Sequence, residues 1–173
     1  IESYGKKIRG RIDEVMTQLQ MVVPVYVLFT KIDLIAGFNE FFGDMKKSDR
    51  QQPWGATFKL SLDKANPQAL FEAEFDNLIK QVHAKSLKRL TTERMREPRE
   101  KIYQFPLEFA GIRKNLGDLI GNVFTVNSFQ GTPILRGFYF TSGTQEGRPM
   151  DRVLANMART YGLRPAQYEE PAG

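Results

Sequence analysis

The sequence predicts an α/β fold, and three observations support this prediction. Residues 22–33 begin with an almost continuous run of β-branched and aromatic side chains, typical of a strand buried on both faces within a parallel sheet. Residues 4–19 repeat apolar side chains at intervals of three and four, which predicts an amphipathic helix lying on that sheet. A second helix-to-strand unit is expected at 66–106. Because a helix leading into a buried strand is half of a βαβ unit, we also expect a parallel strand before residue 1.

The predicted strand ends in the tetrapeptide Thr30-Lys31-Ile32-Asp33. Ligands of open α/β sheets bind outside the carboxyl ends of the strands, so a site is expected there. The pattern resembles the Asn/Thr-Lys-x-Asp base-recognition loop of GTPase-like proteins. The resemblance implies that Asp33 accepts two hydrogen bonds from guanine, that Lys31 lies along the base, and that Thr30 steadies the loop. The alternative is structural: Asp33 accepts backbone N–H groups of its own turn, and Lys31 is a solvated cation.

Residues 44–63 are polar and irregular, and we expect a surface excursion there, anchored by Trp54 and Phe58. The alternative for the tryptophan is a role in an interface. Asn66 and Pro67 match the N-cap and first position of a long helix. Its far end is basic, and it either stops near Glu97-Pro98 or is renewed there as a second short helix, so that residues 80–101 form a basic segment. Further predicted elements are a turn or short helix at 38–44, a strand at 102–106 followed by a loop at 105–111 near the base, a helix at 109–123, a strand at 134–143 and a helix at 150–162.

Composition limits the functions that fit this chain. Its 173 residues are 41% hydrophobic and 12% aromatic, as in a folded globular domain. Cysteine is absent and His83 is the single histidine, which excludes disulfides, thiolate metal sites and multi-histidine centres. We interpret His83 as a surface residue. No apolar run approaches the roughly 18–20 residues of a membrane span, so we expect a soluble, cytoplasmic polypeptide.

The net charge of +5 and the pI of about 9.5 favour acidic partners or a solvated basic surface. Nucleic-acid binding through residues 80–101 is not expected, because Glu93, Glu97 and Glu100 interrupt the cations and no aromatic stacking platform accompanies them. Anionic lipid or a protein partner fits this segment better. The chain opens at Ile1 in a helical pattern, so we expect it to belong to a longer protein.

Several separated blocks of the chain agree, in order, with one family. The blocks are residues 25–38, Phe41-Phe42, Gln52-Pro53-Trp54-Gly55 with Phe58, Phe105-Pro106, and 135–147. They resemble the cytoplasmic domain of the IcmF/TssM proteins, large inner-membrane components of bacterial type VI secretion systems. The resemblance implies a position at the cytoplasmic face of the bacterial inner membrane in a membrane-spanning parent. It also implies an inner-membrane secretion subunit and baseplate proteins as partners.

The same resemblance implies the carboxyl-proximal part of a GTPase-like (P-loop NTPase-like) sheet with flanking helices, plus a C-terminal helical and strand extension. Residues 1–106 are then the base-recognition half, 107–163 a helix-strand-helix extension of the same domain, and 164–173 a mobile tail.

A phosphate cradle requires Gly-x-x-x-x-Gly-Lys-Ser/Thr after a strand, and residues 1–173 contain no such string. No cofactor and no catalysis are therefore expected from this chain alone. We expect a structural and interaction module of the secretion machine. The alternative is a nucleotide-dependent assembly switch, in which the full-length protein binds GTP or ATP through motifs upstream of Ile1.

Overall fold

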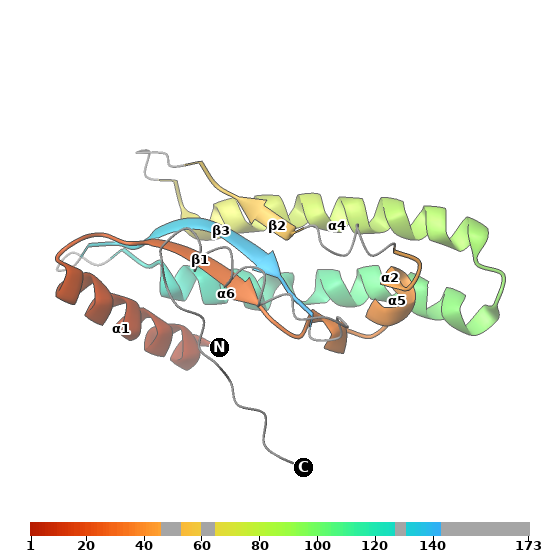
Figure 1. The fold of residues 1–173 in the computed structure, drawn as a ribbon, viewed down its shortest axis with the longest axis horizontal. Coiled ribbons are helices and arrows are strands. Elements are labelled where there is room, and N and C mark those ends of the chain that lie inside the picture. Colours follow the sequence, from red (N-terminus) through yellow and green to blue (C-terminus); the bar gives the residue numbers. More distant parts are fainter. Residues whose placement is uncertain (46–52, 60–64, 127–130, 143–173) are drawn as a thin grey trace, which may run out of the picture. The chain divides into compact units, whose positions relative to one another are not determined.

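The computed structural model describes residues 1–45, 53–59, 65–126 and 131–142. These residues form a small sheet covered on one face by helices, which confirms a mixed α/β class (Figure 1). The elements are α1 (Glu2–Leu19), β1 (Pro24–Phe29), the 3-10 helix η1 (Ile32–Leu34), α2 (Phe38–Phe42), β2 (Trp54–Thr57), α4 (Pro67–Thr92), α5 (Arg96–Gly111), α6 (Arg113–Val123) and β3 (Ile134–Phe140). The predicted helix at 150–162 and tail at 164–173 lie outside the described residues.

The sheet has the strand order β1-β3-β2, so β3 is central. β1 pairs with β3 in parallel, from Pro24 opposite Ile134 to Phe29 opposite Phe140. β2 pairs with β3 in the antiparallel direction. β1 and β3 are neighbours in the sheet, although α2, α4, α5 and α6 lie between them in the chain.

The predicted interior position of β1 is wrong for the described residues. β1 is an edge strand of this sheet, and Tyr26 and Leu28 on its outer face are 47% and 58% exposed. Val25 and Val27 on the other face are half-buried against the core. The side chains of β1 are apolar on both faces of the strand, but the described residues cover only one of these faces. Pro24 at the start of the strand fits this position, because proline in sheets is confined to edges, first residues and bulges.

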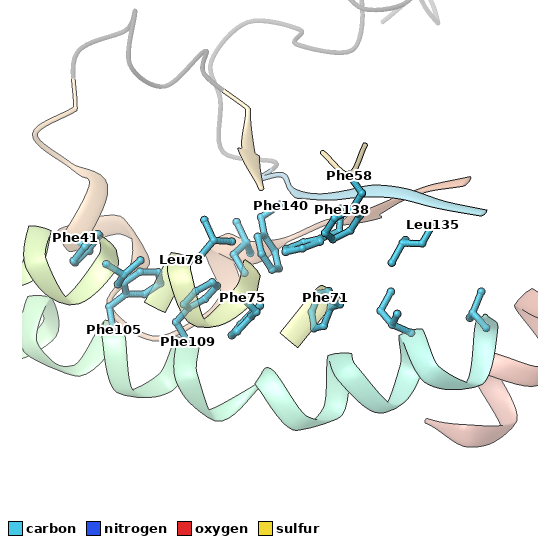
Figure 2. Packing of buried hydrophobic residues seen from close by; sticks show 14 of the residues in the cluster. Phe41, Phe58, Phe71, Phe75, Leu78, Phe105, Phe109, Leu135, Phe138 and Phe140 are labelled. Carbon is cyan, nitrogen blue, oxygen red and sulfur yellow. The ribbon is translucent and has the colours of Figure 1, made fainter. Parts of the chain in front are cut away.

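Phenylalanine rings from the helices and the sheet form the core. In Figure 2, Phe71 and Phe75 of α4 and Phe105 and Phe109 of α5 lie on the helical side, facing Phe138 and Phe140 of β3. The anchoring role predicted for two other aromatic residues is confirmed. The ring centroids of Trp54 lie 4.8 Å from Phe109 and 5.2 Å from Phe140, and Phe58 is buried against Phe138.

The strand predicted at 102–106 is wrong, because these residues lie inside α5. Ile102, Phe105 and Phe109 are fully buried, and their spacing of three and four places them on the core face of one helix. Pro106 has no N–H to donate to the carbonyl of Ile102, four residues earlier. The hydroxyl of Ser86 on α4 donates to that carbonyl instead, at 3.1 Å. This tertiary contact compensates for the proline, and it is not visible in the local sequence.

Ser86→Ala should lower the free energy of unfolding by about 1–3 kcal/mol, because it leaves the buried carbonyl of Ile102 without a donor. In a Pro106→Ala background the backbone N–H of residue 106 is restored, so the same substitution should cost clearly less. Urea unfolding of the four proteins of this cycle measures the difference. An equal cost of Ser86→Ala in both backgrounds would refute the compensation.

A charged cluster joins α4 to the start of α6. Arg113 donates two hydrogen bonds to the carboxylate of Asp76, at 2.6 and 3.0 Å, and forms an ion pair with Glu72 at 3.2 Å. The hydrogen bond from Arg113 holds the pKa of Asp76 below its ordinary value of 3.8. A carboxyl group whose pKa is lower in the folded state stabilises the fold above its unfolded pKa, and the contribution disappears as the pH falls through the folded pKa.

Asp76→Asn should therefore lower stability at pH 7 by about 0.2–1 kcal/mol, the range of partly exposed ion pairs. The difference from the unmodified protein should shrink as the pH falls below 3.8. Thermal unfolding measured across this pH range tests the effect, with Glu97→Gln on α5 as the control. A difference that stays constant with pH would contradict the assignment to ionised Asp76.

Candidate functional site

The three residues predicted to recognise a base lie in one turn at the carboxyl end of β1. Thr30 and Lys31 are exposed and Asp33 is half-buried. Lys31 adopts the left-handed conformation with φ 60° and leads into η1, where Ile32 is buried. The backbone N–H of Leu34 donates to the Lys31 carbonyl at 3.1 Å. Because Ile32 anchors the turn in the core, its polar neighbours are held at the rim of the sheet.

The end of β3 holds this turn from the side. The N–H of Thr141 donates to the carbonyl of Phe29 at 2.9 Å, and the N–H of Ile32 donates to the carbonyl of Thr141 at 3.1 Å. Two backbone hydrogen bonds thus continue the parallel pairing past the end of both strands. Thr141 and the next residue, Ser142, are half-buried, and the hydrogen bonds of Thr141 place it beside the candidate loop.

The place of Thr141 beside the loop was not predicted from the sequence. Residues 105–111, which were predicted to lie near the base, are part of α5. The signal was present: a predicted strand at 134–143 ends in threonine, serine and glycine, and carboxyl ends of parallel strands meet at one edge of a sheet. The neighbour of β1 in the sheet is β3, and not the strand wrongly predicted at 102–106.

Other features that could indicate a function are surface hollows, metal-binding groups and membrane-spanning helices. Two surface hollows are lined by residues at the start of α1 and on α4 and α6, and neither includes Thr30, Lys31 or Asp33. Their lining residues are Ile1, Glu2, Ser3, Lys6 and Lys7 in one, and Ile1, Glu2, Gln68, Asp118, Gly121, Asn122 and Thr125 in the other. The residues that the structure describes contain no group of three histidine or carboxylate side chains placed to hold a metal ion. None of the helices described combines the length and apolar character that crossing a bilayer requires.

The described residues define an α/β domain with a mixed three-stranded sheet and a polar turn at the carboxyl end of its parallel pair. The chain belongs to the IcmF-related N-terminal domain family, whose model matches residues 1–173. It is 42% identical over 163 residues to the type VI secretion system component TssM1 of Pseudomonas aeruginosa. The match covers 93% of this chain and 15% of that relative, so the chain spans a small part of the relative's length.

The family predicted from the sequence is therefore confirmed. No solved structure matches the chain. The GTPase-like character of the sheet consequently stays a prediction, as do the roles of Thr30, Lys31 and Asp33.

Proposed function

We propose that this chain is a structural and interaction module of the cytoplasmic domain of a type VI secretion membrane-complex protein. In this role it contacts the partner inner-membrane subunit and the baseplate at the cytoplasmic face of the inner membrane. Membership of the IcmF-related family supports the setting. The missing phosphate-cradle motif in residues 1–173 supports a role in contacts rather than in phosphoryl transfer.

The observation that carries this proposal is the pair of apolar side chains exposed on the outer face of β1, and α1 exposes further apolar side chains. Ile8, Val15 and Leu19 of α1 are exposed, as are Tyr26 and Leu28 on the outer face of β1. The ring of Tyr26 stacks on Tyr139 of β3, with centroids 6.4 Å apart, so the outer face of the sheet presents an ordered aromatic surface. Apolar side chains that share one exposed face are typical of contact sites.

A pull-down with the partner inner-membrane subunit and with baseplate proteins tests this function. We expect retention of at least one of them, and we expect the double variant Tyr26→Ser/Leu28→Ser to weaken it about tenfold or more, as loss of two buried anchors does. Leu107→Ser on α5 removes an equally exposed leucine elsewhere and should leave binding unchanged. If the chain retains neither the subunit nor any baseplate protein, the proposal fails.

A second candidate is a nucleotide-dependent assembly switch whose phosphate-binding half lies upstream of this chain. It is favoured by the position of Thr30, Lys31 and Asp33 at the carboxyl ends of two parallel strands, beside Thr141. In this function Asp33 accepts a pair of hydrogen bonds from guanine, and GTP or ATP is bound by the full-length protein.

Calorimetry on the full-length protein tests the switch. Asp33→Ala should reduce the preference for guanine over adenine nucleotides by about tenfold or more, because hydrogen bonds to charged groups contribute about 1.5–3 kcal/mol each. Asp118→Ala on α6 is the control and should keep the preference. If the full-length protein binds no nucleotide, the switch is ruled out.

A further inference from the structure

The positive charge of this chain is concentrated at one end of the α4–α5 pair. Figure 1 shows α4 and α5 side by side as a hairpin, with their connecting turn at the end remote from the sheet. We call residues 80–101 the basic end. It holds eight cations and three carboxylates, a net charge of +5, which equals the net charge of the whole chain. The charges of all other residues therefore sum to zero, so the net positive charge of the chain is carried by the basic end.

Some of these cations fix the shape of the hairpin. Arg89 forms an ion pair with Asp44 at 2.6 Å and donates to the carbonyl of Glu40 at 2.7 Å. Arg99 donates to the carbonyls of Leu90 and Glu93, both at 3.0 Å, and so satisfies carbonyl groups at the end of α4. Because these contacts are internal, they hold the basic end in one arrangement.

Other cations of the basic end point into solvent. Lys80, Lys88 and Arg94 are exposed, and Lys88 and Arg94 form no ion pair with any residue that the structure describes. Arg96 is also exposed and pairs with Glu100 in a surface ion pair, which contributes little. The outer side of the basic end thus presents charge that the fold itself does not use.

Two exposed aliphatic side chains are adjacent to these cations in the sequence. Leu87, directly before Lys88 in α4, is 69% exposed. Met95, between Arg94 and Arg96 at the start of α5, is 68% exposed. Aliphatic side chains flanked by lysine and arginine are typical of segments that lie in the interface of a bilayer. There the apolar groups enter the boundary of the acyl chains and the cations meet anionic headgroups.

We propose that the basic end of the α4–α5 hairpin docks on an anionic lipid surface. Lys88 and Arg94 contact phosphate headgroups, and Leu87 and Met95 enter the acyl boundary. Charge complementarity identifies the occupant as anionic, and the two aliphatic groups distinguish a bilayer from a purely polar polyanion. Charge and exposure alone favour this lipid contact, which does not depend on the protein partners proposed above.

Co-sedimentation of the 173-residue chain with large vesicles tests the proposal. Vesicles of phosphatidylglycerol mixed equally with phosphatidylcholine should bind the chain, and vesicles of phosphatidylcholine alone should not. Raising the salt concentration from about 0.1 M to about 0.5 M should weaken binding, because surface charges are then screened. Absence of binding to the anionic vesicles overturns the proposal and would direct attention to an acidic protein or nucleic acid as the partner.

Three double variants locate the contact. Lys88→Gln/Arg94→Gln should weaken vesicle binding about tenfold or more, and Leu87→Ser/Met95→Ser should weaken it severalfold at unchanged charge. Lys7→Gln/Lys114→Gln removes the same charge from exposed positions on α1 and α6 and should change binding little. Circular dichroism checks that each variant is folded. Equal losses in the two charge variants, or no loss in the aliphatic variant, would overturn the assignment to this surface.

Discussion

Phe109→Ala is expected to lower the free energy of unfolding by about 3–5 kcal/mol, a large part of the stability of an ordinary domain. Phe109 is fully buried at the centre of the aromatic core. Its ring centroid lies 4.7 Å from Phe75, 4.8 Å from Trp54 and 5.4 Å from Phe140. The substitution removes contacts with α4, β2 and β3 at once, and rigid neighbouring rings limit how far the cavity can collapse.

Urea unfolding followed by circular dichroism measures this effect, and a shift of the midpoint without a change of slope identifies it as a loss of stability. Tyr103→Ala on the same helix removes a ring that is largely exposed and should cost within about 0.5 kcal/mol. If the two substitutions cost the same, Phe109 is not at the centre of the core.

Arg9→Ala is expected to destabilise the protein by about 3–5 kcal/mol, the usual cost of removing one member of a buried charged network. Arg9 is 9% exposed on α1. Its guanidinium group donates to the carbonyls of Val123 at 3.2 Å, Thr125 at 2.6 Å and Gly131 at 3.3 Å, and to the carboxylate of Asp13 at 2.7 Å. These acceptors lie on α1, at the end of α6 and ahead of β3, so one side chain connects three segments.

Arg9→Lys should also be destabilising, because an ammonium group cannot reproduce the planar arrangement of donors. Arg11→Ala, which removes an exposed ion pair with Glu14 on the same helix, should cost within about 0.5 kcal/mol. Thermal unfolding of the three variants separates the two classes. A small effect of Arg9→Ala would show that water replaces the guanidinium group at these carbonyls.

The helices were predictable where their apolar residues repeat with helical spacing. The ranges expected at 4–19 and from Asn66 onward agree closely with α1 and α4, and the side chain of Asn66 accepts hydrogen bonds from the N–H groups of Gln68 and Ala69 as a predicted N-cap should. The start of α5 at Arg96 agrees with the predicted alternative of a second short helix near Glu97-Pro98. Its continuation to Gly111 was missed because Pro106 and its β-branched or aromatic neighbours resemble a strand locally. The hydroxyl of Ser86 that makes the helix acceptable comes from another element.

The candidate site was partly predictable for a similar reason. Thr30, Lys31 and Asp33 lie within four consecutive positions, so any turn after a strand would keep them close together. Their neighbour Thr141 depends on the pairing of β1 with β3, and no local pattern specifies which strand pairs with which. The edge position of β1 was missed because an apolar run predicts that both faces of a strand are buried. It does not specify which part of a protein covers each face.

The central place of β3 has a consequence for the order in which the protein folds. β3 is the last strand described, yet both other strands pair only with it, and β1 ends at Phe29 whereas β3 begins at Ile134. During synthesis the first strand must wait until the whole helical insertion has left the ribosome, and closing so large a loop is slow. We therefore expect the α4–α5–α6 layer to gain structure first and sheet pairing to be the rate-limiting step of folding.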